Sequence, residues 1–73
     1  MNLNLESLIE YIHKWQTIDV KDQYGMEIDS GYGKCEDVYD SLLSINRNIL
    51  NSPIRFIQAN DTGDIEIFCD VRY

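Results

Sequence analysis

At the end of the chain, apolar residues recur at every second position and alternate with Glu66, Phe68, Asp70 and Arg72. Apolar side chains occupy every second position there: Ile65, Ile67, Cys69, Val71 and Tyr73. Because a strand repeats its side-chain direction every second residue, this alternation predicts a strand with one apolar face. Residues 54–59 predict a second strand, and the turn residues at 60–63 separate the two. We therefore expect a C-terminal β-hairpin whose apolar face needs a cover of helices.

A helix is predicted near the start of the chain. Apolar residues occur there at helical spacing: Leu5, Leu8, Ile9, Ile12 and Trp15. Asn4 precedes them, and an asparagine side chain can accept a hydrogen bond from an N–H group of the first helical turn. The pattern predicts a helix over residues 5–16.

Residues 17–30 contain two short alternating stretches. Ile18 and Val20 belong to the first, Met26 and Ile28 to the second, and the turn-like residues 22–25 lie between them. A second hairpin is the preferred interpretation. The alternative is one strand followed by an irregular loop.

A second helix is predicted over residues 35–50. Apolar residues recur there at steps of four, three and four: Val38, Leu42, Ile45 and Ile49. Acidic residues lie in the first turns, where the helix dipole favours them. Pro53 disfavours helical geometry in the residue before it, so the helix should end by residues 51–53.

These elements predict a single small α+β domain over residues 1–73. Two helices pack on one face of a small antiparallel sheet, in the order α-β-β-α-β-β, or α-β-α-β-β if the middle hairpin is half formed. A hydrophobic content of 44% and a charged content of 26% are typical of a folded globule.

The net charge of −7 narrows the classes of ligand. The six basic residues are scattered singly: Lys14, Lys21, Lys34, Arg47, Arg55 and Arg72. Nucleic acids and anionic membranes bind clusters of lysine and arginine, so neither is an expected partner. No apolar run approaches the roughly 20 residues that cross a bilayer, and no signal peptide is evident. We expect a cytoplasmic protein with Cys35 and Cys69 as reduced thiols, Cys69 within the apolar hairpin face.

Known chemical motifs are not found. Residues 31–34, Gly-Tyr-Gly-Lys, lack the earlier glycine and the following Ser or Thr of a phosphate-binding loop. One histidine and two cysteines are too few for a four-ligand zinc site, and the acids lack the spacing of a calcium loop. We therefore expect no metal, no cofactor and no enzyme activity. An enzyme that uses Cys35 with His13 as its base is kept as a third hypothesis.

The acidic residues concentrate in the middle of the chain, where tyrosines alternate with them. Tyrosine is common at protein interfaces because its ring buries a large area and keeps a polar tip. An ordinary solvated surface produces the same pattern. The candidate partner-binding residues are Asp19, Asp22, Tyr24, Glu27, Asp29, Tyr32, Glu36, Asp37 and Asp40.

Two functional hypotheses from different classes follow. The first is an inhibitor that binds the basic, nucleic-acid-binding surface of another protein, because closely spaced carboxylates imitate a phosphate backbone. Phages and mobile elements use small acidic proteins in this way against nucleases, restriction enzymes or CRISPR effectors, and toxin immunity proteins act similarly. The alternative is a structural or assembly protein that forms a homodimer through a sheet edge, with Ile57 and Phe68 as contacts.

Overall fold

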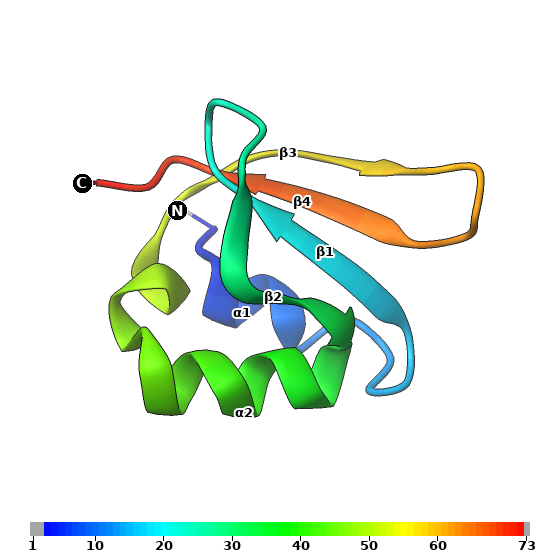
Figure 1. Ribbon diagram of the computed structural model, residues 1–73, viewed down its shortest axis with the longest axis horizontal. Coiled ribbons are helices and arrows are strands. Elements are labelled where there is room, and N and C mark those ends of the chain that lie inside the picture. Colours follow the sequence, from blue (N-terminus) through cyan, green and yellow to red (C-terminus); the bar gives the residue numbers. More distant parts are fainter. Residues whose placement is uncertain (1–2, 73) are drawn as a thin grey trace.

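The computed structural model describes residues 3–72 and shows a four-stranded sheet with both helices on one of its sides (Figure 1). Along the chain the elements are α1 (Leu5–Ile9), β1 (Thr17–Lys21), β2 (Glu27–Lys34), α2 (Cys35–Ile45), the 3-10 helix η1 (Arg47–Asn51), β3 (Ile54–Ala59) and β4 (Ile65–Cys69). Across the sheet the strand order is β2-β1-β4-β3. The prediction of a small α+β domain is confirmed.

The sheet is mixed, so the prediction of a purely antiparallel sheet was wrong. β1 pairs with β2 and β3 pairs with β4 in antiparallel fashion, but the central strands β1 and β4 are parallel. Ile18 lies beside Ile65, and Val20 beside Ile67. Parallel neighbours need a long crossover connection, and the chain from β2 through α2 and η1 to β3 supplies it. The crossover brings together the two strands with the most apolar inner faces.

The core lies between the inner face of this central strand pair and the helices. Ile18 and Val20 of β1 and Ile67 and Cys69 of β4 are fully buried. The helical side contributes Leu5, Ile9, Val38, Leu42, Ile49 and Leu50. The predicted one-sided hairpin face is thus confirmed for residues 65–71, with Ile65 partly buried, whereas Tyr73 lies outside the described residues.

The first helix is much shorter than predicted. Asn4 caps it as expected, accepting a hydrogen bond from the Ser7 N–H at 2.8 Å, but the helix ends at Ile9. Residues 10–16 form turns, and carbonyl oxygens of this loop accept the N–H groups of Cys35 and Glu36 at 2.8 and 3.0 Å. The loop therefore satisfies donors at the start of α2, which has no side-chain cap. Trp15, predicted on the buried face, is exposed.

The second helix also stops early. It ends at Ile45, and Asn46 leaves the helical region with φ −146° and ψ 66°. The chain continues as η1, whose different periodicity turns Ile49 and Leu50 into the core. Ile45, which the apolar spacing placed in line with Val38 and Leu42, is exposed at the end of α2.

β2 carries a large bulge opposite β1. Between the pairs Asp19–Tyr32 and Lys21–Glu27, β2 advances five residues while β1 advances two. Ser30 has a φ of 64° within the bulge, an uncommon angle for a residue other than glycine. The strand thereby places Ile28 in the core and continues directly into α2.

Candidate functional site

The turn between β1 and β2 projects from one end of the sheet (Figure 1). The Asp22 carboxylate is buried within it and accepts the N–H groups of Tyr24 and Met26 at 2.8 and 3.0 Å. Gly25 takes a φ of 80°, which suits glycine. The turn leaves Tyr24 77% exposed and Met26 66% exposed. Two large side chains therefore stand in solvent on a turn with internal hydrogen bonds.

Gln23 ties this turn to the C-terminal segment. Its side-chain nitrogen donates to the Val71 carbonyl at 2.9 Å, and its side-chain oxygen accepts the Val71 N–H at 2.8 Å. The amide thus pairs with Val71 as a strand residue would. Hydrogen bonds hold the side chains of Asp22 and Gln23, the two residues before Tyr24. The turn therefore loses little conformational freedom when it binds a partner.

Five carboxylates lie along β2 and on the first turns of α2. They are Glu27, Asp29, Glu36, Asp37 and Asp40, and all five are exposed. Within residues 3–72 none of them forms an ion pair. Three other acids on or next to the sheet do form ion pairs. Lys21 pairs with both Asp19 and Glu66, and Arg55 pairs with Asp70. The uncompensated negative charge therefore includes the β2 edge and the start of α2.

The structure separates the nine predicted residues into two groups. Asp19 and Asp22 are buried, so the structure leaves little of either side chain accessible to a partner. The other seven are exposed and lie on the turn after β1, on β2 and on the first turns of α2: Tyr24, Glu27, Asp29, Tyr32, Glu36, Asp37 and Asp40. At about 3.3 Å per residue, the eight residues of β2 extend at most about 26 Å between the turn and α2. Tyr32 is the exposed aromatic residue within this strand, and its hydroxyl donates to Asp64 at 3.5 Å.

Asp19 lies at the centre of the sheet face that the helices leave open. Cross-strand pairing places it between Tyr32 of β2 and Glu66 of β4. One carboxylate oxygen is 3.6 Å from the Lys21 ammonium, and the other, Oδ1, is buried without a hydrogen-bond partner in the described part of the chain. Burial raises the pKa of Asp19 above its ordinary 3.8, although Lys21 opposes this change.

Asp19 should therefore make stability depend on pH. A raised folded-state pKa contributes stability that is fully present below about pH 3.8 and is lost as the pH rises through the folded pKa. Asp19→Asn has no such group, so the free energy of unfolding of the variant minus that of the wild type should increase from about pH 3 to about pH 7. Urea unfolding across this range tests the prediction. A difference that is constant with pH would contradict it.

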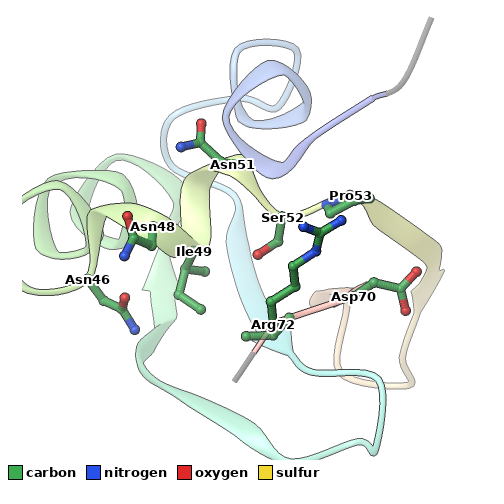
Figure 2. A pocket seen from close by; sticks show the side chains of 9 residues that line it. Asn46, Asn48, Ile49, Asn51, Ser52, Pro53, Asp70 and Arg72 are labelled. Carbon is green, nitrogen blue, oxygen red and sulfur yellow. The ribbon is translucent and has the colours of Figure 1, made fainter.

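A separate polar groove lies between η1 and the C-terminal segment (Figure 2). It has a volume of about 580 Å³, with Asn46, Asn48 and Asn51 on one side and Arg72 on the other. These groups offer amide donors and acceptors and one guanidinium. None of the nine candidate partner-binding residues lines this groove. The signal that sequence reasoning missed is the presence of three closely spaced asparagines.

The two thiols and the histidine are in environments typical of residues with a structural role. Cys35 and Cys69 are free and buried, and the Cys35 thiol donates to the Ile9 carbonyl at 3.8 Å. Burial raises the pKa of Cys35, which is the reverse of what an activated nucleophile needs. His13 Nδ1 accepts the Trp15 N–H at 3.1 Å, within the loop that follows α1. In residues 3–72 no group of three His, Cys, Asp or Glu side chains is arranged to hold a metal ion.

The chain matches no protein-family model, no curated protein and no solved structure. Among the helices in residues 3–72, none is long and apolar enough to cross a membrane. A functional assignment therefore depends on the geometry of the chain's own residues.

Proposed function

We propose that the chain is a protein-binding inhibitor that engages a basic surface of its target. The observation that supports this most is the turn that presents Tyr24 and Met26 to solvent, held by Asp22 and Gln23 and followed directly by unpaired acids. A solvent-exposed tyrosine on a preorganised turn suits the centre of an interface, where a few aromatic residues supply most of the binding energy.

The acids of β2 and α2 define the class of partner. Carboxylates without internal partners lose no ion pair when they meet lysine or arginine side chains of another protein. Complementary charge raises the association rate and excludes partners with a negative surface. A protein surface that binds nucleic acid has the required positive charge. We therefore infer a cytoplasmic role against a nuclease, restriction enzyme or CRISPR effector, as a phage protein would have, or against a toxin, as an immunity protein would have.

The proposal is tested by capture from a lysate of the cells in which the chain occurs. The tagged chain is washed at low and then at high salt, and retained proteins are identified by mass spectrometry. Recovery of a basic nucleic-acid-binding protein that salt releases is the expected result. Recovery of no such protein would argue against the proposal.

Substitutions on the turn should weaken binding to the captured protein. Tyr24→Ala should cost about 2 kcal/mol, roughly thirtyfold in Kd, because it removes the exposed ring. Glu27→Lys should cost about tenfold through charge reversal. Isothermal titration calorimetry with each purified variant measures both effects.

Matched controls exist elsewhere on the chain. Tyr11 is an exposed tyrosine in the loop after α1, and Asp61 is an exposed acid in the turn between β3 and β4, at the other end of the strands (Figure 1). Tyr11→Ala and Asp61→Lys should leave Kd unchanged. Equal losses in the test and control variants would mean that net charge and general surface area, rather than this turn, determine binding.

A further inference from the structure

β3 is an edge strand with apolar side chains on both of its faces. The Leu3 carbonyl accepts the Ile54 N–H at 3.0 Å at the start of the strand. Among residues 3–72, Phe56–Ala59 pair with β4 alone, and all six residues of β3 are at least partly exposed. Phe56 stacks on Phe68 at 4.2 Å on the open face, and Ile57 lies beside Ile67 on the helical side. Even so, Ile57 is 45% exposed, because the helices do not extend over this edge, and Phe56 on the open face is 46% exposed. An exposed edge strand with apolar side chains is a template for another strand.

The backbone of Ile57 is available for pairing. The Asn60 N–H donates to the Asp64 carbonyl at 3.0 Å and closes the β3–β4 hairpin. In an antiparallel ladder, pairs with and without mutual hydrogen bonds alternate from that point. Gln58 and Phe56 therefore face β4 with their backbone groups, and Ile57 and Ala59 direct theirs away from the sheet.

The charges beside this edge are compensated. Arg55 pairs with Asp70 at 2.9 Å, and the Glu66 carboxylate is bound by Lys21 at 3.0 Å and by Gln58 at 2.7 Å. The opposite edge of the sheet, β2, carries the unpaired acids Glu27 and Asp29. Two copies of a chain with a net charge of −7 therefore meet with less repulsion at β3 than at β2.

We propose that a second copy of this chain occupies the β3 edge and pairs with it in antiparallel fashion about a two-fold axis. Such pairing is self-complementary, because each β3 supplies both the outward backbone groups and the apolar side chains that the other needs. The two four-stranded sheets would join into one sheet of eight strands. The dimer does not depend on the proposed inhibitor function, but it would present the two turns with Tyr24 at separate places and so permit bivalent binding.

Light scattering coupled to size-exclusion chromatography tests the dimer over a series of protein concentrations. The wild type should have twice the mass of the chain. Ile57→Lys, which introduces a charge at the edge, and Ile57→Pro, which removes an N–H group that β4 does not use, should both give monomers. Their far-UV circular dichroism should match the wild type, which separates loss of the dimer from loss of the fold.

Ile45→Lys is the matched control, because Ile45 is an exposed isoleucine on α2. This variant should remain a dimer. A monomeric wild type, or a dimer that persists in both Ile57 variants, would overturn the proposal. Dissociation by Ile45→Lys alone would also overturn it and would assign the interface to α2.

Discussion

Gly31→Ala is expected to destabilise the protein by about 3 kcal/mol, a large part of the stability of a chain of this size. Gly31 is buried in the bulge of β2. A Cβ atom there would lie 2.8 Å from the Ile28 carbonyl oxygen and 3.0 Å from that of Val20. Both are backbone atoms, one in the bulge itself and one in the central strand β1, so neither can move aside as a flexible side chain would. Relief requires a shift of the bulge against β1.

Gly25→Ala separates this steric effect from the general cost of replacing a glycine. Gly25 has a φ of 80°, but a Cβ atom there would meet nothing within 4 Å. Its cost should be about 1 kcal/mol, from the backbone angle alone. Urea unfolding followed by far-UV circular dichroism compares the two variants. If Gly31→Ala is no less stable than Gly25→Ala, the close approach of β2 to β1 is not as the structure shows it.

The accuracy of the sequence predictions followed the range of the interactions involved. Strand alternation and the cap by Asn4 are local, and they were predicted correctly. The apolar spacing of the first helix continued through Ile12 and Trp15, yet the chain leaves the helix at Ile9. The loop that follows supplies backbone carbonyls to α2, and that contact joins residues about twenty positions apart. No local pattern contains it.

The burial of two of the candidate residues could not be predicted for the same reason. Asp19 alternates with Ile18 and Val20 and so belongs on the open face, but the alternation cannot reveal that β1 is a central strand whose neighbours cover Asp19. Asp22 did carry a local signal. An aspartate at the start of a turn with glycine three residues later often accepts backbone N–H groups, and Asp22 does so in this structure. No local sequence pattern distinguishes an exposed acid such as Glu27 from a buried one.

The cysteines should be almost inert toward thiol reagents in the folded protein. Burial, with a smaller effect of the Asp70 charge, raises the pKa of Cys69 from 9.0 to about 12. The three-unit difference lowers the thiolate fraction at neutral pH by roughly a thousandfold, and the thiolate is the reactive form. Reaction with Ellman's reagent should therefore slow by at least this factor for Cys69 relative to the chain in denaturant. Cys35→Ser isolates the Cys69 thiol for this measurement.

An introduced thiol provides the reference for accessibility. Ser44 is exposed on α2, so Ser44→Cys should add one thiol that reacts at the rate of a free cysteine, while Cys35 and Cys69 of the same molecule stay slow. A native Cys35 that reacts as fast as the introduced one would contradict the burial seen here. It would also revive the hypothesis of a nucleophile paired with His13, because an accessible thiolate is the first requirement of that chemistry. Slow reaction of both native thiols would instead assign them to the core, where Cys69 packs with Ile67 beneath the helices.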